Sequence, residues 1–331
     1  MSGDAHELSN HLSETLKAFL GEISVTDLTR LSGGANRETW SLNATDDQNQ
    51  SHPLILQLDR PGMERLEGTC AREAKILAVA KTKGVPVPSV IVSGETPNLF
   101  GRSFSITSRI NGETIARKIL RDSQWKIARE NFVADSAKAL AAIHSIKKTD
   151  FDDVQIEETP DPLVTLESIY DALADPHPTF DLAFRWLTKN KPAATDFCFV
   201  HGDFRLGNLL LGETGLSAVL DWEISHFGDP CEDLGWMCVR AWRFGGSGEV
   251  AGIADYENLL EQYHEASGRK VTLPTLLWWE IFGTLRWGVI CLQMGGDFRT
   301  GRTNSLEIAA IGRRVAENEY DLLTSLGRQV L

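Results

Sequence analysis

The sequence predicts an α+β fold in two lobes: a small lobe with an antiparallel sheet and one main helix, then a larger, mostly helical lobe. Short apolar runs separated by turn residues fill the first third of the chain, a pattern typical of β-hairpins. Longer runs with helical spacing follow Gly112. The 331 residues are enough for two packed regions. We place the boundary between residues 110 and 111 and expect the functional site in the cleft between the lobes.

The elements of the first lobe follow from local patterns. An amphipathic run predicts a helix over 8–20, and the glycine turn in SGGANRETW predicts a hairpin over 28–42. Helical spacing over 64–83, ended by Gly84, predicts the main helix of this lobe. The remaining strands are expected at 54–58, 89–92 and 103–110.

The second lobe is predicted from longer helical patterns, interrupted by three short strands. Helices are expected at 124–146, in segments between 161 and 191, and at 233–242, 256–267, 274–294 and 305–326. The short strands are expected at 197–200, 209–211 and 216–220. These strands bracket the segment that carries most of the candidate chemistry.

The charge of the chain is acidic and unevenly distributed. It has 33 Lys and Arg against 46 Asp and Glu, a formal net charge of −13. Such a protein gains little from counterion release on a nucleic acid, so we expect no nucleic-acid partner. Ten acids and no Lys or Arg lie in 150–181, which we interpret as a solvated surface segment or a lid that attracts a cationic acceptor. A second acidic block, 201–235, contains the motif described next.

Cysteine usage and hydropathy favour a cytoplasmic protein. The five cysteines are scattered, without a CxxC pair or zinc-site spacing, which fits a reducing compartment. The N-terminus lacks the basic start and apolar core of a signal peptide. The apolar stretch 276–292 is interrupted by Glu280 and Arg286, so we expect no membrane span.

The strongest motif is HGDFRLGN, residues 201–208, followed by LDWE, residues 220–223. Phosphoryl transfer needs a carboxylate to orient the acceptor hydroxyl, oxygen ligands for magnesium, and a cation near the moving phosphoryl group. Asp203 and Arg205 could supply the first and last of these, while Asn208 and Asp221 could supply the metal ligands. A single loop and a short hairpin would bring these groups together.

With these residues the chain resembles the aminoglycoside phosphotransferase and choline kinase group of the protein-kinase-like fold. Its signature, HxDxxxxN followed by a downstream Asp, is matched without a gap. The DWE triplet, DLGWMCVRAWRFGG and LLWWEIFGTLRWGV are most similar to the bacterial "phosphotransferase family" branch, which is related to the kinase-like domains fused to acyl-CoA dehydrogenases. The resemblance covers about 28–287 and implies ATP-dependent phosphorylation of a hydroxyl group on a small molecule.

The resemblance also implies a nucleotide site in the first lobe. The glycine loop of SGGANRETW looks like the family's nucleotide loop, Glu73 matches the helix glutamate, and the end of the last strand matches the hinge against which the base would lie. The implied nucleotide-binding residues are Ser32, Gly33, Gly34, Ala35, Asn36, Gln57, Glu73, Thr107, Ser108, Arg109 and Ile110. Mg²⁺ would accompany ATP, or GTP, at Asn208 and Asp221.

One position departs from the family pattern. Active relatives usually present Lys or Arg on the third strand, to the phosphates and to the helix glutamate, whereas this chain has Gln57. An amide donates hydrogen bonds but neutralises no charge. The sequence leaves open whether Arg60 or Arg72 compensates, and hence whether the protein is a kinase or a nucleotide-binding pseudokinase.

Several polar residues near the motif have a structural interpretation as well. We expect His201 to brace its loop and His144 to be a core histidine. Asp229, Glu232 and Asp233 are interpreted as helix caps and braces, although a metallohydrolase would use His201, Asp203, Asp221, His226 and Asp229 as ligands. The candidate acceptor residues are Arg240, Trp242, Arg243, Trp279 and Arg286.

The leading hypothesis is therefore a Mg²⁺-dependent small-molecule O-kinase. Its acceptor is expected to be a hydroxy acid or a hydroxyacyl thioester, on the strength of the branch resemblance. The pseudokinase is the first alternative and the metallohydrolase a distant one. The sequence does not determine the oligomeric state.

Overall fold

The computed structural model describes residues 2–31, 37–60, 69–95, 100–152, 154–159, 161–193, 195 and 197–330. The chain divides into two compact units. The first unit comprises Met1–Gly112 together with two later segments, Lys148–Gln155 and Ser217–Ile224. The second unit comprises the remainder. The later segment 217–224 contains Asp221, so the two halves of the sequence motif belong to different units.

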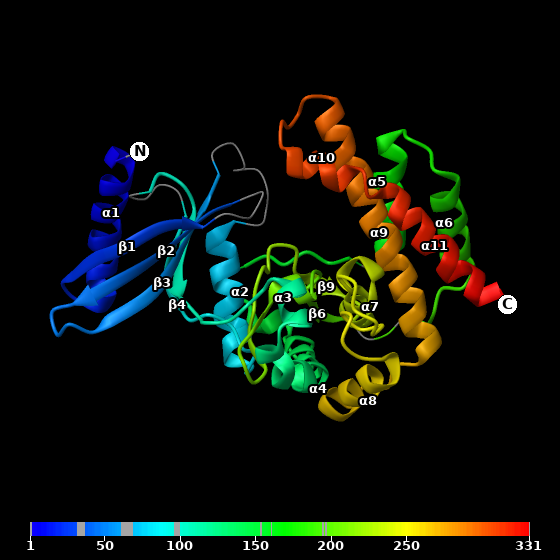
Figure 1. The fold of residues 1–331 in the computed structure, drawn as a ribbon, viewed down its shortest axis with the longest axis horizontal. Helices are drawn as coiled ribbons and strands as arrows, with labels where there is room; N and C mark the ends of the chain where they lie inside the picture. Colours follow the sequence, from blue (N-terminus) through cyan, green and yellow to red (C-terminus); the bar gives the residue numbers. More distant parts are fainter. Residues whose placement is uncertain are drawn as a thin grey trace. The chain divides into compact units, whose positions relative to one another are not determined.

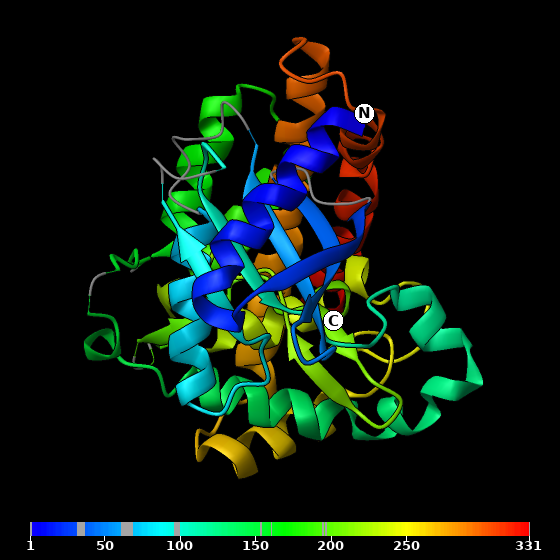
Figure 2. The ribbon, with the colours of Figure 1, turned by 90° about the vertical axis from the view of Figure 1, so that its left-hand side faces the viewer.

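The first unit is built on a five-stranded antiparallel sheet with the strand order β1-β2-β3-β5-β4. The strands are β1 (Ile23–Leu31), β2 (Arg37–Asp46), β3 (Ser51–Asp59), β4 (Val90–Gly94) and β5 (Phe104–Ser108). Helix α1 (Ser2–Leu20) lies across one face of this sheet (Figures 1 and 2). Leu12 and Leu16 of α1 are fully buried there.

Alternation along the strands separates an apolar face from a polar one. Leu54, Leu56 and Leu58 of β3 pack with the α1 residues, so Gln57 between them points to the opposite face. Buried polar residues share that opposite face, because Gln57 pairs with Ser105 and Ile55 pairs with Thr107. The sheet therefore presents its polar face away from the α1 core.

Helix α2 (Cys70–Thr82) is the main helix of the first unit. Thr69 caps it by accepting a hydrogen bond from the Arg72 backbone N–H at 3.1 Å. The predicted helix began at residue 64, and residues 64–68 lie outside the described part of the chain. The α2 backbone is tied to the sheet, since the Cys70 N–H donates to Asp59 Oδ1 at 3.1 Å.

The second unit is mostly helical, as predicted (Figure 1). Its α-helices are α3 (Ala116–Arg121), α4 (Lys126–Ile143), α5 (Pro162–Leu173), α6 (Pro178–Lys189), α7 (Cys231–Cys238), α8 (Tyr256–Ser267), α9 (Leu273–Arg299), α10 (Leu306–Gly312) and α11 (Val315–Val330). Short 3-10 turns occur at Ser123–Trp125, Leu206–Asn208 and Arg240–Trp242 in this unit, and at Lys148–Asp150 in the first. Its core joins α5, α6, α9 and α11.

The short strands bracket the motif as expected. They are β6 (Cys198–Val200), β7 (Leu209–Leu211), β8 (Leu216–Val219) and β9 (His226–Gly228). Strand β6 pairs antiparallel with β9, which the sequence did not indicate.

Two predicted helices are divided. The helix expected over 305–326 is two helices, α10 and α11, and the backbone of Gly312 at the end of α10 lies close to Gly295 of α9. A Cβ at Gly312 would lie 2.5 Å from the Gly295 Cα, so a side chain there would prevent this approach. The helix expected over 233–242 ends at Cys238, because Val239 has an extended ψ of 130°.

The acidic segment 150–181 contains α5 and the start of α6. Asp161 caps α5 and forms an ion pair with Lys191 at 2.6 Å, and Asp175 pairs with Arg299 at 2.8 Å. Leu163, Leu166 and Tyr170 bury the other side of α5 in the core. Part of the acidity thus serves helix capping and surface ion pairs.

The sequence predicted that the cysteines form no disulfide framework and that the chain has no membrane span. All five cysteines are buried and unbridged, and burial raises the pKa of Cys291 to about 12. In the described part of the chain, no helix is long and apolar enough to cross a membrane.

Candidate active site

The loop after β6 carries Asp203, and buried residues on both sides of it hold it in place. Phe204 and Leu206 are fully buried, which anchors the loop between Asp203 and Asn208. Gly202 has a φ of +80°, a conformation that a residue with a side chain rarely adopts. His201 Nδ1 accepts a hydrogen bond from the Asp203 backbone N–H at 3.2 Å. His201 therefore braces the loop, as the sequence predicted.

Asp233 of α7 holds the backbone of this loop in place. Its carboxylate accepts hydrogen bonds from the backbone N–H groups of His201 and Gly202, each at 2.8 Å. His144 Nε2 lies 3.1 Å from the same carboxylate, while its Nδ1 lies 2.7 Å from the Tyr263 hydroxyl. Burial raises the pKa of Asp233, but the hydrogen bond and charge of His144 and the charge of His201 outweigh it and hold that pKa below its ordinary value. Asp233 is thus a brace for the loop.

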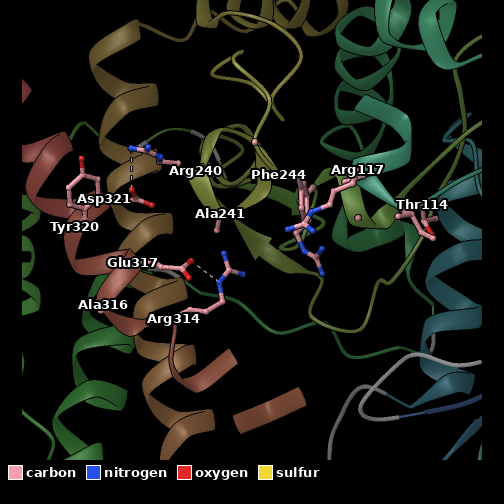
Figure 3. Close-up of a pocket in the computed structure, with 15 residues that line it drawn as sticks. Thr114, Arg117, Arg240, Ala241, Phe244, Arg314, Ala316, Glu317, Tyr320 and Asp321 are labelled. Atoms are coloured by element: carbon pink, nitrogen blue, oxygen red, sulfur yellow. Dashed lines mark hydrogen bonds and ion pairs between the residues drawn. The ribbon is translucent and has the colours of Figure 1, made fainter. Parts of the chain in front are cut away.

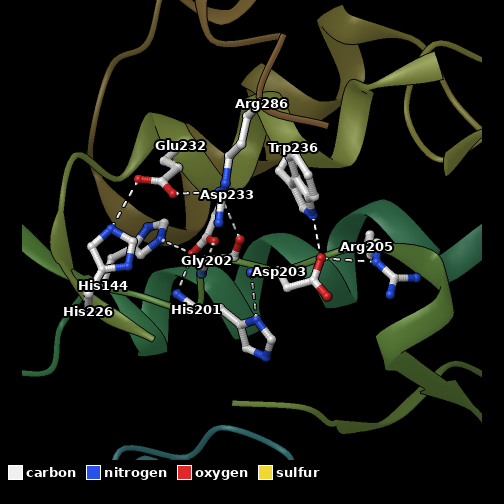
Figure 4. Close-up of polar contacts among 10 residues, drawn as sticks. All are labelled: His144, His201, Gly202, Asp203, Arg205, His226, Glu232, Asp233, Trp236 and Arg286. Atoms are coloured by element: carbon white, nitrogen blue, oxygen red, sulfur yellow. Dashed lines mark hydrogen bonds and ion pairs between the residues drawn. The ribbon is translucent and has the colours of Figure 1, made fainter. Parts of the chain in front are cut away.

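Glu232 and Arg286 form a second brace (Figure 4). Arg286 Nη1 donates to the Gly202 carbonyl at 3.2 Å and to Glu232 Oε1 at 2.9 Å. The other Glu232 oxygen lies 3.2 Å from His226 Nε2. Arg286 was predicted to contact the acceptor. In the structure it contacts the Gly202 carbonyl and Glu232, and its guanidinium carbon lies 4.8 Å from the centre of the Trp236 ring.

The Asp203 carboxylate is held by three donors, of which Figure 4 shows Arg205 and Trp236. Arg205 Nε donates to Oδ1 at 3.0 Å, and Asn208 Nδ2 donates to Oδ2 at 2.6 Å. The third donor is the Trp236 indole N–H, which lies 2.6 Å from Oδ1. The Asp203 side chain is 15% exposed, so its carboxylate is oriented by these donors and is still accessible.

Trp236 is a site residue that sequence reasoning missed. It follows Asp233 by three positions on α7, so both side chains lie on one face of that helix. Since Asp233 binds the loop backbone, a residue on the same face would also be expected to reach the loop. The spacing DLGW could have indicated this contact.

Arg205 is positioned by two neighbours besides Asp203. Its guanidinium carbon lies 4.6 Å from the centre of the Trp242 ring, a cation–π arrangement. A Cβ at Gly207 would overlap Arg205 Nη1, so the glycine leaves room for the guanidinium. Trp242 is therefore placed under Arg205 and is 5% exposed.

A cavity of about 1120 Å³ lies beside this loop in the second unit (Figure 3). Four arginines line it against two carboxylates: Arg117, Arg205, Arg240, Arg314, Glu317 and Asp321. Arg240 pairs with Asp321 at 3.4 Å, and Arg314 pairs with Glu317 at 2.9 Å. Among the described residues, Arg117 makes no ion pair. The cavity wall thus carries an excess of positive charge.

Of the five predicted acceptor residues, Arg240 lines this cavity, and the other four, Trp242, Arg243, Trp279 and Arg286, do not. Arg243 is committed to the interior, where its Nη2 donates to Glu280 at 2.7 Å and to the Cys238 carbonyl at 2.9 Å. Trp279 is 4% exposed and packs in the helical core. Arg243 and Trp279 are therefore engaged in contacts within the protein.

Four of the predicted nucleotide-binding residues, Thr107 to Ile110, lie on β5 or directly after it. Thr107 is buried on the polar face, and Ser108 Oγ accepts from the Ser89 N–H at 2.9 Å. Arg109 donates to Ser41 Oγ at 2.6 Å and to Asn43 at 3.0 Å, while Ile110 follows the strand and is partly exposed. The predicted loop residues 32–36 lie outside the described part of the chain.

Glu73 has a partner that the sequence did not indicate. Its side chain pairs with Arg37 of β2, and its other oxygen accepts from the Trp222 N–H at 2.9 Å. Arg72 instead donates to the Glu223 carbonyl at 3.4 Å. Gln57 lies on the polar face of β3 next to this group.

The metallohydrolase arrangement is not formed in the second unit. His226 contacts Glu232, Asp229 accepts from the Cys231 N–H at 2.8 Å, and His201 contacts the Asp203 backbone. Throughout the described ranges, no three His, Cys, Asp or Glu side chains gather in a way that could hold a metal. These ligands are used separately as braces.

Comparison with known proteins identifies the family of this chain. The model of the phosphotransferase enzyme family matches residues 27–271. The chain belongs to the phosphotransferase enzyme family. This confirms the resemblance, and with it the predicted enzyme class and the kinase-like α+β fold.

Individual relatives agree with the family. Acyl-CoA dehydrogenase family member 10 of Mus musculus is 25% identical over 96% of this chain, and the match covers 31% of that protein. The chain thus spans about a third of the length of the curated relatives it matches. A Ralstonia eutropha protein assigned as an aminoglycoside phosphotransferase has a TM-score of 0.75 at 20% identity, with 96% of this chain and 98% of that one covered. The GDP complex of aminoglycoside 2′-phosphotransferase-IIIa has a TM-score of 0.67 at 13% identity, with 95% and 99% covered.

Proposed function

We propose that this phosphotransferase is a kinase that transfers the γ-phosphoryl group of ATP to a hydroxyl group of a small anionic molecule. The observation that carries the proposal is the Asp203 carboxylate, which three donors orient beside an arginine-lined cavity. A carboxylate held in this way can accept the proton of a hydroxyl group and direct its oxygen at a phosphorus atom. The GDP complex of a structural neighbour supports nucleotide use by the family.

The roles follow from the contacts. Asp203 orients and deprotonates the acceptor hydroxyl. Arg205 uses Nε to hold Asp203, so its terminal nitrogens remain to stabilise charge on the transferring phosphoryl group. Trp236 and Asn208 keep the carboxylate from rotating. Catalysis of this kind depends on positioning more than on basicity.

The residues present fit a magnesium ion. The Asn208 amide nitrogen is committed to Asp203, so the amide oxygen is the atom that would serve as a hard ligand. Asp221 is the second ligand in this proposal on the strength of the sequence motif. When bound, Mg²⁺ supplies positive charge that offsets the charge of the nucleotide phosphates.

The acceptor class is inferred from the cavity. Four guanidinium groups face two carboxylates there, and arginine binds carboxylate and phosphate groups in a bidentate manner. A hydroxy acid, or a hydroxyacyl thioester with a phosphorylated carrier, fits this charge, whereas a cationic amino sugar does not. The curated relatives, which are named for acyl-CoA dehydrogenases, are consistent with an acyl acceptor.

A phosphorylation screen tests the acceptor class. Purified protein with ATP and Mg²⁺ is presented with hydroxy acids, hydroxyacyl thioesters and amino sugars, and ADP and phosphorylated product are measured. We expect turnover on an anionic acceptor. Arg117→Ala and Arg240→Ala should raise KM for that acceptor about tenfold each, through loss of a charge-assisted contact, and should leave kcat nearly unchanged. Arg121→Ala, which removes an arginine from the same helix as Arg117 outside the cavity lining, is the matched control. Turnover on amino sugars alone would contradict the anionic class.

A further inference from the structure

Glu73 is a buried carboxylate that needs a cation. It lies on α2 with 4% of its surface exposed. A charge buried to this extent is tolerated only when it is paired and hydrogen-bonded. The family resemblance implies that a Lys or Arg on β3 would pair with this glutamate, but the residue there is Gln57, which carries no charge. Among the described residues, the Gln57 side chain makes no hydrogen bond.

Arg37 supplies the missing charge from the neighbouring strand. Its Nη1 donates to Glu73 Oε2, and its Nη2 lies 3.7 Å from Glu223 Oε2. Arg37 is itself 7% exposed, so its charge is held between two carboxylates with little water. In the strand register Arg37 pairs with Asp59, and Thr39 pairs with Gln57. Arg37 and Gln57 are therefore diagonal neighbours on the same face of the sheet.

The contact continues to the residue after Asp221. The second Glu73 oxygen accepts from the Trp222 N–H at 2.9 Å. The Trp222 ring is fully buried and its indole N–H donates to the Val219 carbonyl at 3.1 Å. Asp221 has a φ of +67°, in the left-handed region that is uncommon for residues with side chains but more often adopted by Asp and Asn. Contacts of the neighbouring residues can stabilise this backbone conformation.

We propose that Arg37 is the positioning residue that, through Glu73 and the Trp222 N–H, holds Asp221 in the conformation needed for metal binding. The cation that stabilises the helix glutamate has moved from the third strand to the second. Gln57 is then compatible with catalysis. The neutral residue on β3 was the reason to consider a pseudokinase, and under this proposal it no longer favours one. The metal-binding part of this inference rests on the proposed function; the Arg37–Glu73–Trp222 chain of contacts does not.

Hydrogen exchange of the Trp222 amide tests the chain of contacts in the ligand-free protein. Arg37→Gln should make this amide exchange at least about tenfold faster, since Glu73 loses its cation and leaves its acceptor position. Arg102→Gln is the matched control, because Arg102 pairs with Glu38 near the same sheet and does not contact Glu73. Unchanged protection of Trp222 in Arg37→Gln, or equal loss in Gln57→Ala, would overturn the proposal.

A magnesium titration tests the consequence for the metal site. The readout is thermal stabilisation by ATP as the Mg²⁺ concentration rises. Arg37→Gln should raise the half-saturating Mg²⁺ concentration about 10- to 100-fold, as is usual when a residue supporting a metal ligand is lost. Moving the cation back, in Arg37→Gln combined with Gln57→Lys, should recover most of this loss. Failure of the single variant to change the titration would overturn the positioning role.

Two further comparisons separate the possible failures. If Arg37→Gln does not fold, Arg37→Lys keeps the charge but loses the guanidinium fork, and it should give smaller changes in the same direction. No change in either measurement for Arg37→Lys, in that case, would overturn the proposal. If the wild-type protein shows no Mg²⁺-dependent stabilisation by any nucleotide, the proposed function fails, while the Trp222 exchange result still decides the role of Arg37 in holding the segment.

Discussion

The two units use arginine in opposite ways. In the first unit, Arg37 is 7% exposed and lies between two carboxylates, so its charge is balanced by groups of the protein itself. In the second unit, Arg117, Arg205, Arg240 and Arg314 line a cavity with fewer carboxylates than guanidinium groups. The Arg240 side chain keeps 55% of its exposure. A buried arginine paired with two carboxylates fixes a conformation, whereas the cavity arginines, each with at most one carboxylate partner among the described residues, are available to a ligand.

This contrast should appear most strongly in stability. Arg37→Ala leaves Glu73 buried without its cation and should lower the free energy of unfolding by about 3 kcal/mol. Arg240→Ala removes an exposed ion pair and should change it by less than about 0.5 kcal/mol. Urea unfolding of the two variants measures both values. Equal losses would break the comparison.

The cavity arginines should instead respond to small changes in position. In Gly207→Ala the added methyl group would overlap Arg205 Nη1, so the guanidinium must shift. We expect kcat to fall about 10- to 100-fold because the charge is misplaced relative to the phosphoryl group. The melting temperature should remain near the wild-type value, because the end of a flexible side chain can move at little cost. A stable variant with wild-type kcat would remove Arg205 from the transfer step.

The smallest effect is expected at the carboxylate opposite Arg240. Burial raises the pKa of Asp321, and the charges of Arg240 and Arg243 lower it only in part. A carboxyl group whose pKa is raised on folding destabilises the folded state above that pKa and has no such effect below its unfolded value.

Asp321→Asn should therefore be slightly more stable than the wild type at pH 7, by no more than about 0.5 kcal/mol. The difference should vanish as the pH falls toward the ordinary carboxyl pKa. Denaturant unfolding from pH 4 to pH 8 measures this trend. The variant should also bind an anionic acceptor more tightly, since the cavity loses a negative charge. A variant that is less stable at pH 7 would contradict the assigned sign.

The sequence predicted the elements well wherever periodicity was strong. Helix α8 and strand β7 match their predicted ranges, 256–267 and 209–211. The sequence did not predict the break before α11, nor the close approach of Gly312 to Gly295 of another helix. Local patterns contain no information on such long-range backbone contacts.

The candidate site shows the same limit. The motif indicated Asp203, Arg205 and Asn208, which lie within six positions and are in contact. Trp236 and Arg37 were missed, since each acts on a residue more than 30 positions away. Arg243 and Trp279 were predicted as acceptor residues from their chemical type, but burial decided their place. Residue type identifies candidates, and tertiary packing decides which of them reach a ligand.

The central claim, that Asp203 directs phosphoryl transfer to a hydroxyl group, is tested most directly by Asp203→Asn. The measurement is transfer of the terminal phosphoryl group of ATP to the best acceptor from the screen, together with nucleotide-induced thermal stabilisation. We predict transfer about 10²- to 10⁴-fold slower than in the wild type, with the stabilisation by nucleotide retained. Transfer within about twofold of the wild-type rate would contradict the account.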